Sequence, residues 1–167
     1  MPKANLADLE IYYEEQGSGE PILLAPASWW PSHTWNVGVV PVLSKRFKTI
    51  TFDCLGTGRS GQPRDGYAVA QFAKDCISLL AYLGIARCHA VGFALGGQIM
   101  QAMAIEQPDR VVTLTIAASG GRHEDAHGRP AQFVAGYGTR NSDDRFRALH
   151  SQLHRKRQHG FQSKILP

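Results

Sequence analysis

The sequence predicts an α/β fold built around a parallel sheet, and three observations support this class. Over residues 1–120, short apolar runs alternate with segments of helical periodicity, a pattern typical of strand–helix–strand units. The continuous apolar runs 21–25 and 111–118 fit strands that are covered on both faces. Glycines punctuate the connections between these segments. A chain of 167 residues is also long enough to bury a core as one domain.

The first half of this region is predicted to contain three strands and one helix. The apolar residues of 9–13 predict a strand, which the turn Gly17-Ser18-Gly19 ends. A helix is predicted over residues 34–46, although this segment contains Pro41. The remaining predicted strands of this half are 21–25 and 47–52.

The second half begins with a glycine-rich loop over residues 53–66. Apolar residues at helical spacing then predict a helix over 67–83, which Gly84 ends. Residues 111–118 are the most apolar run of the chain, so we expect them to form a central strand. The other elements predicted here are a strand over 88–91 and a helix from Leu95 to just before Pro108.

The composition divides the chain into a core region, 1–120, and a basic tail, 121–167. The core region has nine basic and ten acidic residues, whereas the tail has nine basic and four acidic residues. The tail contains only five Ile, Leu or Val residues, and one helix is predicted in it, over 143–158. We interpret the tail as lid-like or irregular, and we expect no nucleic-acid or membrane partner.

The cysteines and the N-terminus indicate a cytoplasmic protein. Cys54, Cys76 and Cys88 are widely spaced and odd in number, which is typical of free thiols in a reducing compartment. The N-terminus lacks the apolar run of a signal peptide, and no run approaches the ~18 apolar residues of a membrane span. No cluster of residues has metal-ligand spacing, so neither a metal nor an organic cofactor is expected.

The segment most informative about chemistry is 91–98, between a predicted strand and a predicted helix. Its pattern, in which Gly92 and Gly96 flank a central residue, is typical of a sharp turn that projects this residue above the sheet. The central residue is Ala94. The amide of the next residue, Leu95, is expected to stabilise an oxyanion from the helix N-terminus.

This turn resembles the nucleophile elbow of the α/β-hydrolase fold family. Two further segments, in the expected order, are similar to motifs of that family: 53–60, a loop of the form Asp-x-x-Gly-x-Gly-x-Ser, and Pro108-Asp109-Arg110-Val111 before an apolar strand. The resemblance covers residues 10–120 and is nearest in pattern to enol-lactone hydrolases and esterase-like members. From the residues alone, we expect Asp53 to hold the Gly56–Gly58 loop through backbone amides.

The resemblance implies a carbonyl site that has lost its nucleophile. Ala94 stands where the family has its nucleophile, Ala25-Pro26 replace a common His-Gly pair, and the family's acid and histidine follow later strands. The chain is therefore expected to be an incomplete fold that is inactive in nucleophilic catalysis. The oxyanion-hole amides are expected at Leu95 and at Ala27 or Ser28, and the pocket residues are expected to be Trp29, Trp30 and Phe93.

Several alternatives remain open at this stage. Ala94 is consistent with an engineered substitution, a natural loss or chemistry without a nucleophile. The expected ligand is a small apolar ester, lactone or related carbonyl compound; the alternatives are a non-catalytic binding module and a nucleophile-independent lyase or oxygenase. The strand over 111–118 offers an edge for self-association, unless the tail covers it. The tail's composition also resembles out-of-frame reading of a hydrolase gene.

Overall fold

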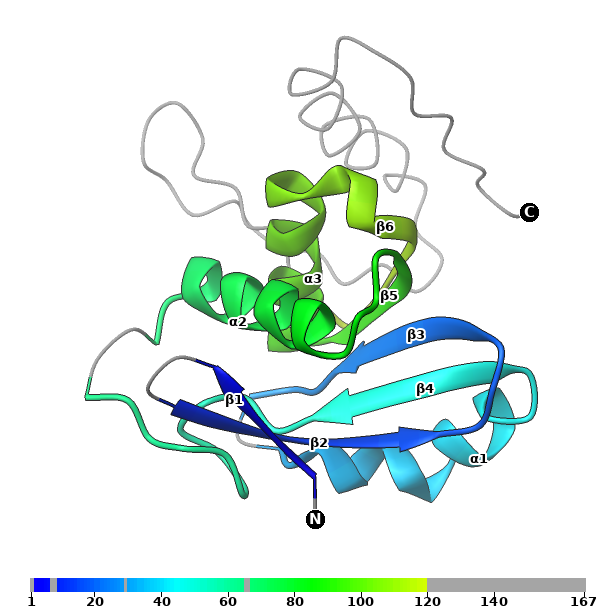
Figure 1. Cartoon of the computed structure of the whole chain (residues 1–167), viewed down its shortest axis with the longest axis horizontal. Coiled ribbons are helices and arrows are strands. Elements are labelled where there is room, and N and C mark those ends of the chain that lie inside the picture. Colours follow the sequence, from blue (N-terminus) through cyan, green and yellow to red (C-terminus); the bar gives the residue numbers. More distant parts are fainter. Residues whose placement is uncertain (1, 7–8, 29, 65–66, 120–167) are drawn as a thin grey trace, which may run out of the picture.

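The computed structural model describes residues 2–6, 9–28, 30–64 and 67–119, and it places one sheet between two helical layers (Figure 1). Helices α2 and α3 pack on one face, and η1 and α1 pack on the other. This arrangement of three layers confirms the predicted α/β class with a parallel sheet. The elements are β1 (Lys3–Leu6), β2 (Leu9–Gln16), β3 (Glu20–Ala25), η1 (Ser32–Val37), α1 (Val40–Leu43), β4 (Phe47–Phe52), α2 (Val69–Tyr82), β5 (Cys88–Phe93), α3 (Leu95–Glu106), η2 (Pro108–Arg110) and β6 (Val111–Ala117).

The sheet has the order β1-β2-β4-β3-β5-β6 over the described residues. Strands β4, β3, β5 and β6 run parallel, whereas β1 and β2 are added antiparallel at one edge. The four parallel strands therefore end at the same edge of the sheet, which is where open α/β folds bind ligands. Asp53 follows β4, Pro26 follows β3 and Ala94 follows β5 at this edge.

The predicted strands are present, but the short strand β1 was not predicted. Two of its four residues are apolar: Ala4 is buried, and Leu6 packs against the core. Pairing with β2 also supports it, in a register that runs from Lys3 opposite Tyr12 to Leu6 opposite Leu9. The alternation of Ala4 and Leu6 with polar residues is too short to predict a strand from the sequence alone.

The helices α2 and α3 confirm two predictions, whereas the single helix predicted over 34–46 is wrong. This segment forms a short 3₁₀ helix, η1, and a separate four-residue helix, α1. Gly38 ends η1 with an extended φ of −158°. Pro41 lies in the first turn of α1, where its missing N–H is tolerated. In one continuous helix, the same proline would have interrupted the backbone hydrogen bonds.

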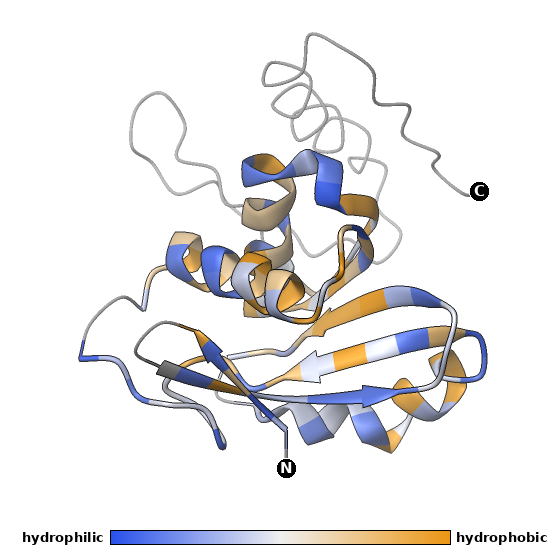
Figure 2. Ribbon diagram, in the orientation of Figure 1, coloured by the Kyte–Doolittle hydropathy of each residue, from blue (hydrophilic) through white to orange (hydrophobic). Residues whose placement is uncertain are grey.

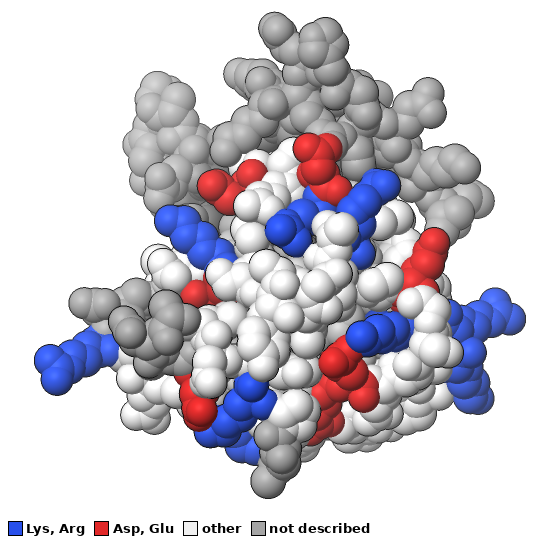
Figure 3. Space-filling model, in the orientation of Figure 1, with Lys and Arg blue, Asp and Glu red and all other residues white. Residues whose placement is uncertain are grey.

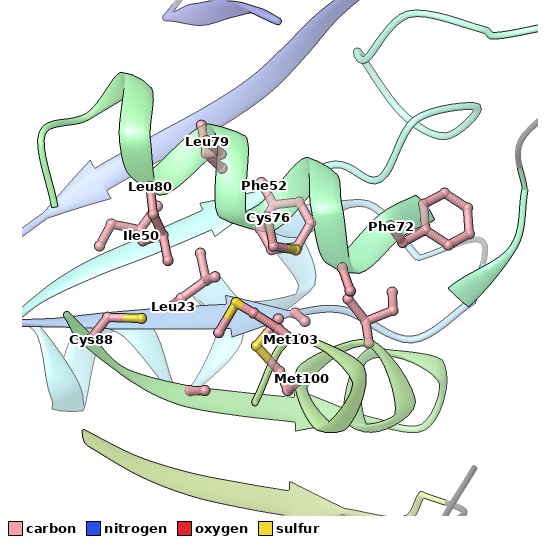
Figure 4. Packing of buried hydrophobic residues seen from close by; sticks show 14 of the residues in the cluster. Leu23, Ile50, Phe52, Phe72, Cys76, Leu79, Leu80, Cys88, Met100 and Met103 are labelled. Atoms are coloured by element: carbon pink, nitrogen blue, oxygen red, sulfur yellow. The ribbon is translucent and has the colours of Figure 1, made fainter. Parts of the chain in front are cut away.

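The main core lies between the sheet and helices α2 and α3 (Figure 4). Leu23 of β3 and Ile50 of β4 are fully buried there, beneath Leu79 and Leu80 of α2. A smaller cluster on the opposite face joins Ile22 and Leu24 to Val40 of α1. Strand β3 is thus covered on both faces, as its continuous apolar sequence predicted, and Figure 2 shows apolar residues toward its C-terminal end.

Within the part of the chain that the structure describes, strand β6 lies at the end of the sheet and not in the central position that its apolar sequence predicted. Among the described residues it pairs with β5 alone and is the last strand of the sheet. Its apolar character reflects one packed face: Val111 is buried in the core and Leu114 packs against it, whereas Val112 is 38% exposed. Residues 121–167, including the helix predicted over 143–158, lie outside the described residues.

Figure 3 shows acidic and basic side chains interspersed around a largely uncharged centre on one face. Within the described residues, no helix combines the length and apolar character that crossing a membrane requires.

The three cysteines are buried and form no disulfide. Burial raises the pKa of Cys54 and of Cys88 to about 12, and it raises the pKa of Cys76 well above its ordinary value. Since the thiolate is the reactive form, we expect none of the three to react with Ellman's reagent at pH 8 in the native chain. After unfolding in guanidinium chloride, all three should react rapidly. One thiol that reacts rapidly in the native chain would contradict this packing.

Candidate functional site

Ala94 connects β5 to α3 and has an unusual backbone conformation. Its φ is 51° and its ψ is −116°, a region that residues with a Cβ rarely adopt and that costs about 1–3 kcal/mol. Two hydrogen bonds hold it there: the Ala94 amide donates to the Ala117 carbonyl, and the Gly97 amide donates to the Ala94 carbonyl, each at 3.0 Å. The neighbouring strand and the first turn of α3 therefore impose this conformation together.

Gly92 and Gly96 allow the backbone segments at this turn to approach closely. A β-carbon on Gly92 would overlap the carbonyl group of Gly96. A β-carbon on Gly96 would overlap the carbonyl oxygens of Ala25 and Pro26. The first turn of α3 therefore packs directly on the chain that leaves β3.

This contact places the segment after β3 beside the elbow. Ala25 and Gly92 are paired in the parallel register of β3 and β5, and Pro26, Ala27 and Ser28 follow directly. Ala27 and Ser28 are half-buried, and the Ala27 carbonyl accepts a hydrogen bond from the Trp30 amide at 3.2 Å. These residues therefore lie at the same sheet edge as the start of α3.

Leu95 is the first residue of α3. The first amides of a helix have no carbonyl partner within the helix, and the helix dipole adds partial positive charge at this end. The start of a helix therefore favours negative charge on a neighbouring oxygen. Among the described residues, no cluster of His, Cys, Asp and Glu is placed to hold a metal ion.

Trp30 and Phe93 form an aromatic pair next to the elbow. Their rings are stacked, with centroids 5.9 Å apart and planes at 26°. Phe93 is half-buried and directly precedes Ala94, whereas Trp30 is 51% exposed. The pair therefore presents an aromatic surface to solvent at this edge. Trp29, the third predicted pocket residue, lies outside the described residues.

Asp53 follows β4 at the same edge and is fully buried. Its Oδ2 atom accepts a hydrogen bond from the Arg59 amide at 2.8 Å, which confirms the predicted attachment to the glycine loop. Its Oδ1 atom accepts a second bond from the Ser32 amide at 2.6 Å. A β-carbon on Gly58 would overlap the Asp53 carboxylate, so the loop requires glycine there.

The partners that surround Asp53 were not predicted from the sequence. The Arg59 guanidinium lies 3.5 Å from the centroid of the Tyr12 ring, and its Nη2 atom donates to Glu14 Oε1 at 3.3 Å. Tyr12 also donates its hydroxyl proton to Glu14. The signal available in the sequence was weak: Tyr12 and Glu14 are two residues apart and therefore share one face of a strand.

The pKa shifts in this cluster favour the charged carboxylates. Burial raises the pKa of Asp53, but hydrogen bonds from Ser32 and Arg59 and the charge of Arg59 outweigh it, so the net shift is downward. The hydrogen bond from Tyr12 lowers the pKa of Glu14 in spite of burial. Burial and the hydrogen bond to Glu14 raise the pKa of Tyr12 to about 12. At neutral pH, Arg59 therefore faces two carboxylates.

The chain is similar in sequence to a known protein family and to its members. Residues 24–165 match a family model described as the alpha/beta hydrolase fold. RutD of Azorhizobium caulinodans, whose name refers to carbamate hydrolysis, is 35% identical over 116 residues, which cover 70% of this chain and 43% of that protein.

The chain is also similar to solved structures of lactone-degrading enzymes. The enol-lactonase from Burkholderia xenovorans LB400 has a TM-score of 0.65 and 27% identity, with 71% of this chain and 47% of that chain covered. Est816, described as an N-acyl homoserine lactone degrading enzyme, has a TM-score of 0.66 and 28% identity, with 71% and 46% covered. The chain thus spans less than half the length of each of these relatives.

Replacing Ala94 with glycine is expected to stabilise the chain. Glycine adopts positive φ without a clash, so the variant relieves about 1–3 kcal/mol of backbone strain. The greater entropy of its unfolded state opposes this by about 0.4–1 kcal/mol. We therefore expect the free energy of unfolding to rise by about 1 kcal/mol, measured by urea denaturation.

The variant Ala81→Gly is the matched control, because Ala81 lies exposed in α2. Glycine inside a helix costs about 0.5–1 kcal/mol relative to alanine, so this variant should lose stability. Equal losses in both variants would show that the backbone at Ala94 is not strained.

Proposed function

The chain belongs to the α/β-hydrolase fold family, and on this premise we propose that its site binds a small carbonyl compound without nucleophilic turnover. The observation that carries the proposal is Ala94, which has the strained conformation of the elbow but only a methyl side chain. A methyl group has no lone pair with which to attack a carbonyl carbon, so no covalent intermediate forms at this position.

Two backbone amides remain as donors to the ligand's carbonyl oxygen. One is the amide of Leu95 at the start of α3, and the other is the amide of Ala27 or Ser28. The pairing of Ala25 with Gly92 and the packing of Gly96 on Pro26 support this arrangement, because they bring the two segments to one place. Each hydrogen bond to a neutral carbonyl contributes about 0.5–1.5 kcal/mol, so the site favours ligands that present this oxygen.

The proposed ligand is an ester, a lactone or a carbamate with an apolar group. The names of the relatives refer to a carbamate, an enol-lactone and an acyl homoserine lactone, and all three compounds carry an acyl carbon bonded to oxygen or nitrogen. The stacked rings of Trp30 and Phe93 supply an aromatic surface beside the elbow. Aromatic and apolar side chains commonly line small-molecule sites, while a few polar groups orient the ligand.

Binding alone is favoured over a lyase or oxygenase reaction at this site. Proton transfer without a nucleophile still requires a base with a free lone pair near the ligand. Among the described residues, the carboxylate that directly follows a parallel strand at this edge is that of Asp53, which is fully buried and accepts hydrogen bonds from Ser32 and from Arg59. Its lowered pKa also makes it a poor base. The described part of the site thus supplies oxyanion donors and an apolar surface.

Phenyl acetate and ethyl phenyl ether test the proposal as a matched pair of ligands, because the ether lacks the carbonyl oxygen. Loss of one hydrogen bond of about 1 kcal/mol corresponds to about five-fold weaker binding. We therefore expect phenyl acetate to bind about five-fold more tightly than the ether in a fluorescence titration. Equal affinities would contradict the assignment of the amides as oxyanion donors.

Turnover is tested separately with p-nitrophenyl acetate. The chain should release p-nitrophenolate no faster than buffer does, because the methyl group of Ala94 cannot accept the acetyl group. Release faster than in buffer would refute binding without turnover.

A further inference from the structure

We propose that Arg59 is a positioning residue that holds the connection between β3 and η1 in the geometry that the carbonyl site requires. This connection includes Pro26–Ser28 and Trp30–Pro31. The effect of Arg59 on ligand binding rests on the proposed function, whereas its effect on the connection does not.

The connection is fixed at its two ends by different interactions. At its start, Ala25 is paired with Gly92 in the sheet. At its end, the Ser32 amide donates to Asp53 Oδ1 at 2.6 Å. Ser32 is fully buried and is the first residue of η1. The position of the proposed amide donor and of Trp30 therefore depends on how firmly Asp53 is held.

Arg59 binds the second carboxylate oxygen of Asp53, Oδ2. Its amide and its Nε atom both donate to Asp53 Oδ2, at 2.8 Å and 3.4 Å. Asp53 is fully buried, and a buried carboxylate requires an opposite charge and hydrogen bonds to remain ionised. Removal of the Arg59 guanidinium therefore removes the positive charge that lies next to the Asp53 carboxylate.

Arg59 also contacts the connection and the sheet directly. Its Nη2 atom lies 3.5 Å from Ser32 Oγ and 3.3 Å from Glu14 Oε1, and its guanidinium stacks over Tyr12. Glu14 is itself bound by Asn36 Nδ2 at 3.2 Å. One side chain thus links the glycine loop, β2 and η1. The planar fork of arginine makes these contacts simultaneously, which the single ammonium of lysine does not.

The consequence for the site is geometric. An oxyanion donor acts only when it is held close to the position of the carbonyl oxygen, and a shift of about 1 Å removes most of its effect. Arg59 lies at the end of the connection opposite to Ala25, so its loss frees that end while the strand pairing remains. We expect the fold to persist and the proposed donor and Trp30 to become less well placed.

The tryptophans provide a readout of this connection that needs no ligand. All three tryptophans of the chain, at positions 29, 30 and 35, lie within or next to it. We expect Arg59→Gln to increase the acrylamide quenching of tryptophan fluorescence about two-fold, because the loss of ordered packing increases access of the quencher. We expect the same variant to bind phenyl acetate about five-fold more weakly.

Arg87→Gln is the matched control. Arg87 is exposed and directly precedes β5 at the opposite end of the strands. This variant should change neither quenching nor binding. Glu14→Gln is the second test variant, because it removes one of the two charges that face Arg59 and keeps a side chain of similar shape. It should give a smaller change in the same direction as Arg59→Gln.

Added methylguanidinium should restore the quenching and the binding of an Arg59→Ala variant, because the guanidinium site is partly open to solvent, with Arg59 37% exposed. An Arg59→Gln variant with native circular dichroism and unchanged quenching would overturn the proposal. If that variant does not fold, unchanged quenching in Glu14→Gln would overturn it as well. Increased quenching in Arg59→Gln, with no binding of phenyl acetate by any form, would support the positioning role and refute the proposed function.

Discussion

The contact between the first turn of α3 and the end of β3 is the constraint on which the rest of the site depends. Gly96 lies against the carbonyl groups of Ala25 and Pro26, and no larger residue fits there. The helix can approach this closely only because the chain turns sharply at Ala94, with positive φ. The strained turn and the close packing are thus one feature, and together they bring the amide of Leu95 to the edge where the segment after β3 begins.

The charged cluster around Asp53 complements this contact from the other side of β3. The glycine contact acts through shape, whereas the cluster acts through fixed charges and hydrogen bonds from Ser32 and Arg59. Both are built on strands whose inner faces are fully buried, such as Leu23 of β3 and Ile50 of β4. The rigid sheet therefore carries two short connections whose backbone amides would face a bound carbonyl compound.

Local features of this arrangement could be predicted from the sequence, whereas the distant ones could not. The sharp turn at Ala94 depends on glycines within two residues of it, and strand β3 is a single apolar run. The local sequence is therefore enough to predict both features. The prediction of a single helix over 34–46 was wrong because it gave too little weight to Gly38 and Pro41. In the structure, η1 ends at Gly38, and Pro41 lies in the first turn of the separate helix α1. Glu14 and Arg59 are 45 residues apart in the chain, and only the antiparallel pairing of β2 with β4 brings them together. No local pattern contains that information.

The amide resonances of the site test the central claim most directly. In a ¹H–¹⁵N correlation spectrum of the labelled chain, titration with phenyl acetate should shift the Leu95 amide and the Ala27 or Ser28 amide downfield with one saturation curve. At saturation, ethyl phenyl ether should shift these two amides much less, because it offers no carbonyl oxygen. Saturable shifts elsewhere in the spectrum, with both amides unmoved, would contradict the proposal that this sheet edge is a carbonyl-binding site.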